Sequence, residues 1–155
     1  MTTPTDIRDL RSDDAELAAA LYRQCFDSPW ERAWTAEEFA RLLAAPGCFG
    51  SLWLCDRTAA GLVLARIAAD EAEVLTLGVT PPFRRRGGAR RLLAVARARC
   101  QRDGAHNLYL EVADDNVPAR RLYAAQGLSE VGRRPAYFDR GADPPAAAIV
   151  LRLAL

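Results

Sequence analysis

The stretch LTLGVTPPFRRRGGARRLL, residues 75–93, decides the fold. It starts as an apolar strand that Pro81 and Pro82 bring to an end, and five arginines then surround two glycines where a helix begins. Arginines in the first turn of a helix oppose the helix dipole, at roughly 0.3 to 1 kcal/mol each where they are exposed. A bound anion would turn this conflict into attraction, because the N–H groups of the helix start and the guanidinium groups would face it together. The order of strand, glycine turn and helix therefore predicts an α/β fold with an anion site at this junction.

The spacing alone leaves a second interpretation equally open, namely a solvated arginine-rich helix face that follows a glycine turn. The phosphate-binding pattern G-x-x-x-x-G-K-(S/T) and the dinucleotide pattern G-x-G-x-x-G are both absent. A nucleic-acid patch is the weakest interpretation, because aromatic residues are not interleaved with these arginines as they are in single-strand binding grooves.

Length and composition describe one soluble domain, which we expect to span residues 1–155. Half of the 155 residues are hydrophobic, 26% are charged, and the formal net charge is +1. So small a net charge gives the chain as a whole no electrostatic reason to bind nucleic acid or a membrane surface. All 21 basic residues are arginine and none is lysine.

The four cysteines show no C-x-x-C spacing and the chain has a single histidine, so we expect no metal site. The first residues, MTTPTDIRDLRSDDAEL, lack the apolar core of a signal peptide, and no apolar run is long enough to span a membrane. We therefore expect a cytoplasmic protein with no membrane partner.

Hydrophobic periodicity and the positions of glycine and proline predict the order of the elements. A strand over residues 5–10 precedes a helix that Ser12 caps, and Thr35 caps a second helix. Three strands within residues 49–79 read as an antiparallel meander. The remaining elements are a helix over residues 88–103, a strand over 107–112, a helix over 116–126, and two closing strands over 128–138 and 146–154.

Two motifs resemble those of the GNAT N-acetyltransferases. Arg84-x-x-Gly87-x-Ala89 resembles the (Q/R)-x-x-G-x-(G/A) loop with which this family binds the pyrophosphate of acetyl-CoA. The block LYLEVADDNVPARRLYAAQGL, residues 108–128, resembles the pattern L-x-L-E-V-x-x-x-N-x-x-A-x-x-L-Y-x-x-x-G-F of the RimI-type ribosomal-protein alanine N-acetyltransferases, with Leu128 where phenylalanine is usual. The resemblance covers residues 74–128 and implies a single-domain GNAT fold, a mixed and mostly antiparallel seven-stranded sheet flanked by four helices.

The resemblance also implies which residues bind the cofactor, acetyl-CoA. The backbone of Leu77, Gly78 and Val79 would contact the acetyl group and the pantetheine arm. Asn116 would contact the cofactor too, although an N-cap for the helix that follows explains this residue by itself. The pyrophosphate would lie against the loop residues Arg84, Arg85, Arg86, Gly87, Gly88, Ala89 and Arg90.

Acetyl transfer needs a base, because an amine at neutral pH is mostly protonated and cannot attack a thioester. The resemblance assigns this role to Glu111, acting through water, and the leaving thiolate would receive a proton from Tyr123, which would also contact the cofactor. Alternation along the strand places Glu111 on the face of Tyr109. From the residues alone, Glu111 can also be interpreted as an exposed glutamate at a strand end, and Tyr123 as a core tyrosine.

The acceptor amine is expected between residues 26–34 and the closing hairpin. SPW, residues 28–30, and RRPAYF, residues 133–138, resemble the F-P-W and R-R-x-Y-Y of the RimI type. Trp30, Trp34 and Tyr137 are therefore candidate acceptor contacts, although tryptophans at such spacing also serve packing. An α-amino group, with a pKa near 8, is easier for Glu111 to deprotonate than a lysine near 10.4.

We therefore expect an acetyl-CoA-dependent N-acetyltransferase that acts on a protein or peptide N-terminus, such as that of a ribosomal protein, by direct attack in a ternary complex. It would work as a monomer or homodimer, without direct contact to nucleic acid. Residues 141–145 depart from the acidic turn usual in the RimI type, which leaves two alternatives open. One is transfer to a lysine side chain or a small-molecule amine, and the other is a non-catalytic acyl-CoA-binding sensor.

Overall fold

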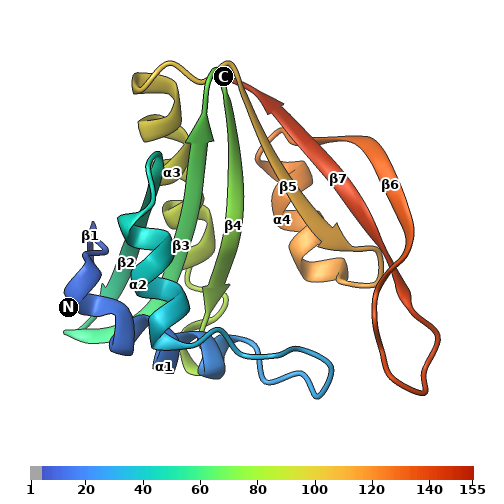
Figure 1. The fold of residues 1–155 in the computed structure, drawn as a ribbon, viewed down its shortest axis with the longest axis horizontal. Coiled ribbons are helices and arrows are strands. Elements are labelled where there is room, and N and C mark those ends of the chain that lie inside the picture. Colours follow the sequence, from blue (N-terminus) through green and yellow to red (C-terminus); the bar gives the residue numbers. More distant parts are fainter. Residues whose placement is uncertain (1–4) are drawn as a thin grey trace.

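The computed structural model describes residues 5–155, which form one seven-stranded sheet with helices on both faces (Figure 1). The strand order is β1-β2-β3-β4-β5-β7-β6, and only β4 and β5 run parallel. The strands are β1 (Thr5–Asp9), β2 (Cys48–Cys55), β3 (Thr58–Ala68), β4 (Glu71–Val79), β5 (Asn107–Ala113), β6 (Ser129–Phe138) and β7 (Ala146–Ala154). The α-helices of this part of the chain are α1 (Ala15–Cys25), α2 (Ala36–Ala44), α3 (Gly88–Arg102) and α4 (Val117–Ala125).

This architecture confirms the predicted fold class, a mixed and mostly antiparallel sheet of seven strands with four helices. The element boundaries follow the glycines and prolines of the sequence. Strand β4 ends at Val79, a 3-10 turn follows over Pro81–Phe83, and α3 ends just before Gly104, which has a positive φ of 93°. Among residues 5–155, no helix is both long and apolar enough to cross a bilayer.

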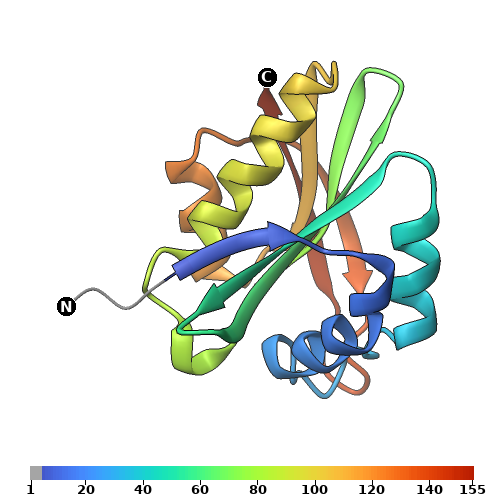
Figure 2. The ribbon, with the colours of Figure 1, turned by 90° about the vertical axis from the view of Figure 1, so that its left-hand side faces the viewer.

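The two pairs of helices cover opposite faces of the sheet (Figures 1 and 2). Helices α1 and α2 pack on β2 and β3 through a cluster that includes Phe39, Leu62 and Leu64. The alternate residues of β3, Val63 and Ala65, point to the other face, where they join the cluster beneath α3 and α4. The strand alternation therefore divides the core into two layers.

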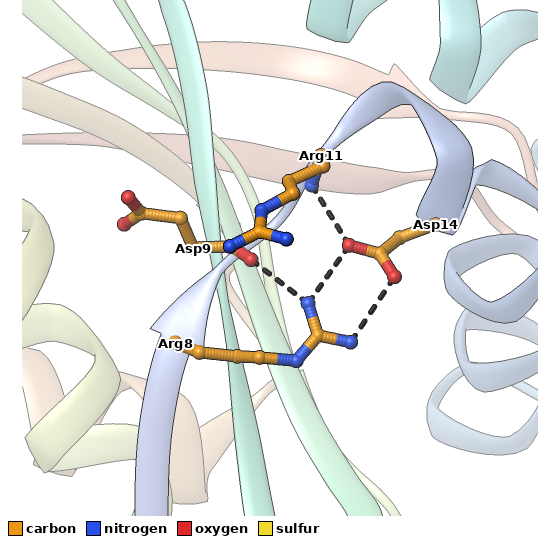
Figure 3. Close-up of polar contacts among 4 residues, drawn as sticks. All are labelled: Arg8, Asp9, Arg11 and Asp14. Carbon is orange, nitrogen blue, oxygen red and sulfur yellow. Dashed lines mark hydrogen bonds and ion pairs between the residues drawn. The ribbon is translucent and has the colours of Figure 1, made fainter.

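The start of the chain differs from the prediction that Ser12 caps the first helix. Residues Ser12–Asp14 form a 3-10 turn, the helix begins at Ala15, and no side-chain cap bond is made there. Asp14 organises this junction instead, because its carboxylate accepts two bonds from the Arg8 guanidinium at 2.9 and 3.1 Å and one from the Arg11 N–H at 2.9 Å (Figure 3). The Arg8 hydrogen bond, followed by the Arg11 N–H, lowers the pKa of Asp14 against the effect of burial.

Strands β4 and β5 are paired at one end only. Their register runs from Glu71 opposite Asn107 to Glu73 opposite Tyr109, and beyond these pairs the strands diverge (Figure 1). A bulge at this point sets Ala65 of β3 opposite Val74 and Leu64 opposite Thr76, so Leu75 is the extra residue in β4. The divergence opens the sheet in its middle and positions the candidate site.

Candidate active site

A cavity of about 640 Å³ lies between the diverging ends of β4 and β5. Ala119 and Tyr123 of α4 line it from one face of the sheet, and Tyr22 of α1 and Trp30 of the following loop line it from the other. A cavity walled from both faces passes through the layer of strands. Two molecules can therefore approach one another inside it from opposite sides.

The loop between β4 and α3 presents free amides at one side of this opening. Gly87 adopts a left-handed conformation, with φ of 78°, at the N-cap of α3. The main-chain N–H groups of residues 87–90 find no hydrogen-bond acceptor within residues 5–155. Four unpaired donors at the positive end of a fifteen-residue helix fit a phosphate-type anion, such as the pyrophosphate of acetyl-CoA.

The arginine side chains of this loop make different contacts. Arg84 turns away from the helix start, and its guanidinium donates to the carbonyls of Val79 and Cys25, each at 3.1 Å. The Arg86 guanidinium lies 5.3 Å from the centre of the Phe83 ring. Within the described residues, no hydrogen bond or ion pair engages the side chains of Arg85 and Arg90, which leaves those two guanidinium groups available for a ligand.

Two glycines to which the resemblance gives a cofactor contact, Gly78 and Gly88, are also required by packing. A Cβ at Gly88 would lie 2.1 Å from the buried Trp53 ring, so α3 can start here only with glycine. A Cβ at Gly78 would lie 2.7 Å from the Phe26 ring and 2.9 Å from the Cys25 side chain. Of the predicted backbone contacts in β4, the structure brings Leu77 to the cavity wall.

Glu111 lies in the cavity wall, on the face of β5 opposite the buried leucines. This is the face that strand alternation predicts. Its side chain is 26% exposed, and its Oε1 accepts from Nε of Arg134 on β6 at 2.8 Å. The carboxylate is thus partly shielded from water and held by one cation, with its second oxygen left for another partner.

Tyr123 faces the same cavity from α4 and is 8% exposed. Burial raises the pKa of Tyr123 to about 12, because an ionised phenolate would lose its hydration. No residue of the described chain hydrogen-bonds to its hydroxyl group. The hydroxyl therefore stays protonated and remains available as a hydrogen-bond donor within the cavity.

Asn116 serves as the N-cap of α4, as the residue type suggests. Its side-chain oxygen accepts from the Ala119 N–H at 3.3 Å, and the residue also lies in the cavity wall. The cap and a cofactor contact are compatible, because an amide oxygen has a second lone pair and the amide nitrogen keeps both hydrogens.

The structure separates the three predicted acceptor contacts. Trp30 and Tyr137 lie in the cavity wall, with 45% and 53% of their surfaces exposed. Trp34 does not line this cavity; its ring stacks on Tyr22 with the centroids 5.1 Å apart and lies 5.4 Å from Phe39. The second tryptophan therefore packs between α1 and α2.

Sequence reasoning missed a polar assembly in the cavity wall near Trp30. Arg140, in the loop between β6 and β7, forms a two-pronged ion pair with Asp115 at 2.9 and 3.1 Å and lies over the Trp30 ring at 4.6 Å. The three residues come from three loops, so no periodicity or local motif links them in the sequence.

The described cysteines are all free thiols. Burial raises the pKa of Cys25 to about 12 and that of Cys100 to about 11. A thiol so hard to ionise is a poor nucleophile, which favours direct transfer over a cysteine-bound intermediate. Within residues 5–155, no group of three or more His, Cys, Asp and Glu is arranged to hold a metal ion.

The profile of the Acetyltransferase (GNAT) family matches residues 15–128, which include both diverging strands, the amide-rich loop and α4. The chain belongs to the GNAT acetyltransferase family. It is accordingly an N-acetyltransferase with acetyl-CoA as the acyl donor, and the predicted family is confirmed.

Individual proteins resemble the chain over most of its length. The N-alpha-acetyltransferase RimI of Mycobacterium tuberculosis is 37% identical over 152 residues, which cover 92% of this chain and 90% of that protein. An uncharacterised protein of Mycobacterium leprae is 34% identical over 145 residues, 90% of this chain, and the chain spans only 39% of its length. The crystal structure of the ribosomal-protein alanine N-acetyltransferase of Escherichia coli superposes with a TM-score of 0.87 over 97% of this chain and 94% of that one, at 23% identity.

Proposed function

We propose that this GNAT enzyme acetylates the N-terminal α-amine of a protein or peptide by direct attack in a ternary complex. The observation that carries the proposal is that Glu111 and Tyr123 face one cavity, which reaches both faces of the sheet. The similar protein of Mycobacterium tuberculosis is named for transfer to an α-amine, which supports the same acceptor class here.

The free amides of residues 87–90 and the guanidinium groups of Arg85 and Arg90 would hold the pyrophosphate of acetyl-CoA. Leu77 would line the path of the pantetheine arm between the strands. When bound, acetyl-CoA supplies an activated thioester carbonyl. The chain's own contribution is to orient that group, to accept the amine's proton and to stabilise the charge that develops on sulfur.

Glu111 would accept the proton that the acceptor amine must lose, directly or through one water. An α-amino group has an ordinary pKa near 8, so a carboxylate assisted by water can deprotonate it far more easily than a lysine ammonium near 10.4. Arg134 restrains the carboxylate through one oxygen only, so the other remains free to accept. One bonded oxygen fixes the orientation of the carboxylate, while the free oxygen can accept the proton.

Tyr123 would donate a hydrogen bond to the departing sulfur. With a pKa of about 12 against about 8.5 for a thiol, complete proton transfer to the thiolate is unfavourable by roughly 5 kcal/mol. A hydrogen bond needs no such transfer. The buried hydroxyl therefore stabilises the developing thiolate, and solvent completes the protonation after release.

The proposal extends to the setting of the enzyme. A cytoplasmic protein of one domain, acting as a monomer or homodimer on a protein N-terminus, fits the free thiols and the single sheet. The Escherichia coli protein of the same fold is named for the alanine of a ribosomal protein. A ribosomal N-terminus that begins with alanine is therefore the acceptor to test first.

The deciding experiment offers the enzyme a matched panel of acceptors with acetyl-CoA and measures thiol release. The panel contains peptides with a free N-terminus and no lysine, the same peptides with a blocked N-terminus and one internal lysine, and small amines. We expect turnover of the free N-termini, with mass spectrometry placing the acetyl group on the α-amine. Preferential turnover of lysine or of small amines would refute the acceptor assignment, and acetyl-CoA binding without turnover of any amine would indicate a sensor.

A further inference from the structure

We propose that Arg140 is a positioning residue, which joins the three loops around the acceptor end of the cavity and thereby sets the affinity for the acceptor. The inference rests on the proposed function, because it concerns the amine-binding side of the same site. Three segments meet there: the α1–α2 loop with Trp30, the β5–α4 loop with Asp115, and the β6–β7 loop with Arg140 itself.

The pair with Asp115 has the geometry that only arginine provides. Nη1 and Nη2 of Arg140 donate to Oδ2 and Oδ1 of Asp115 at 2.9 and 3.1 Å, a parallel two-bond contact. The Arg140 side chain is only 17% exposed, although it lies in a surface loop. The hydrogen bond from Arg140 is also the main cause that lowers the pKa of Asp115.

The same guanidinium reaches the third loop through its flat face. Its Cζ lies 4.6 Å from the centre of the Trp30 ring, within the range of a cation–π contact. Next to this ring, burial raises the pKa of Glu31, and the Arg140 charge opposes that rise. One side chain thus contacts Trp30 and Asp115 and acts electrostatically on Glu31.

Within the described part of the chain, no other polar side chain connects the first of these segments to the other two. Among residues 5–155, no hydrogen bond or ion pair links the α1–α2 loop to residues 114–116 or to residues 139–145. The stacked guanidinium is therefore the polar link between the first loop and the other two. Because Trp30, Asp115 and Arg140 all line the cavity, loosening that link changes the wall that an acceptor would touch.

The consequence for kinetics is specific. Arg140 contacts neither the amide-rich loop nor Tyr123, so its loss leaves acetyl-CoA binding and the chemical step unchanged. A more mobile wall must be ordered each time an acceptor binds, which weakens acceptor binding. We expect Arg140→Gln to raise KM for the acceptor about tenfold, with kcat and KM for acetyl-CoA within about twofold of wild type.

A matched control is Arg66→Gln. Arg66 is an exposed arginine of β3 that pairs with Glu73 at 3.1 Å, and it does not line the cavity. This variant is expected to keep the wild-type KM for the acceptor. Arg140→Lys keeps the charge but loses the planar fork, so it should restore less than half of the lost affinity.

Hydrogen exchange of the unliganded enzyme provides a readout that needs no acceptor. Arg140→Gln should speed exchange in residues 26–35 and 139–145, and Arg66→Gln should not. Unchanged exchange in these segments would overturn the inference, as would an unchanged acceptor KM, a loss confined to kcat, or full rescue by lysine. If wild type acetylates no N-terminal peptide, the proposed acceptor fails, while the exchange experiment still decides the role of Arg140.

Discussion

At the scale of single residues, the candidate site combines a carboxylate and a hydroxyl in different surroundings. Glu111 keeps access to solvent and to one arginine, whereas Tyr123 is enclosed and has no hydrogen-bond partner in the described chain. The first environment keeps a proton acceptor hydrated enough to exchange its proton with water. The second holds a donor in its neutral form at any pH below about 12.

Replacing the proposed base tests its role directly. Glu111→Gln removes the proton acceptor but keeps the shape of the side chain, so kcat should fall by about 100-fold or more. The affinity for acetyl-CoA, measured by calorimetry, should stay within about twofold. Glu130→Gln, on the exposed edge strand β6, is the control and should retain full activity. Wild-type kcat in the Glu111 variant would remove this residue from the mechanism.

Replacing Tyr123 by phenylalanine deletes a hydroxyl that makes no hydrogen bond in the described chain. We expect kcat to fall about 10- to 100-fold, because the departing sulfur loses a hydrogen-bond donor in a buried site. The midpoint of thermal unfolding should change little, since the hydroxyl faces the cavity and makes no hydrogen bond with the described residues. A large loss of stability with normal kcat would instead identify Tyr123 as a structural residue.

At the scale of elements, Arg84 links a helix to a strand. Its guanidinium bonds to the carbonyl of Cys25 at the end of α1 and to that of Val79 at the end of β4. The motif resemblance assigns Arg84 to the pyrophosphate, whereas these contacts give it a bracing role. Both ends of this brace border the cavity, because Phe26 and Leu77 lie in its wall.

The two roles of Arg84 predict different results for Arg84→Ala. As a brace, the substitution should lower the free energy of unfolding by about 1 to 2 kcal/mol, because two carbonyl groups lose a charged donor. Urea unfolding measures the change in the free energy of unfolding. A fluorescence titration of Arg84→Ala with coenzyme A should also show weaker binding than wild type. Arg85→Ala, which breaks no contact with the described residues, should weaken coenzyme A binding without changing stability. Equal stability of both variants would favour a direct phosphate contact for Arg84.

The sequence predicted the elements well because local signals mark their ends. Pro81 and Pro82 follow β4, Gly127 follows α4, and Thr35 caps α2 through its hydroxyl. The motif resemblance proposes Glu111 and Tyr123 as site residues, and the structure brings both to one cavity wall. Strand alternation predicted the correct face of β5 for Glu111. The pairing of Arg140 with Asp115 could not be predicted, because it joins loops 25 residues apart through tertiary packing alone. The packing role of Trp34 could not be predicted either, because it depends on the tertiary contacts of its ring with Tyr22 and Phe39.

At the scale of the whole molecule, pairs of arginine and carboxylate link stability to pH. Hydrogen bonds from arginines lower the pKa of three carboxyl groups, those of Asp14, Glu38 and Asp115. A carboxyl group whose pKa is lower in the folded state stabilises that state above its unfolded pKa, near 3.9 for aspartate, and loses this effect as the pH falls through the folded value. The protein should therefore resist heat best above about pH 4 and lose stability in acid.

Asp14 should contribute most to this acid sensitivity, because it is the least exposed of the three and binds both Arg8 and the Arg11 N–H. Asp14→Asn should lower the free energy of unfolding by about 1 kcal/mol at pH 7, and the difference from wild type should narrow at pH 3. Thermal unfolding at both pH values measures this. Asp13→Asn, a neighbour without a hydrogen bond to Arg8, is the control. A difference that is independent of pH would contradict the electrostatic explanation.

The divergence of β4 and β5 also affects the order in which substrates bind and products leave. Since the cavity is walled from both faces of the sheet, the nucleotide end of the donor and the body of the acceptor protein would occupy separate sides and meet only at the thioester. Neither has to leave before the other arrives. Under the proposed function, an acetylated chain could depart while spent coenzyme A is still bound, and a folded protein could offer its N-terminus without disturbing the exchange of cofactor behind it.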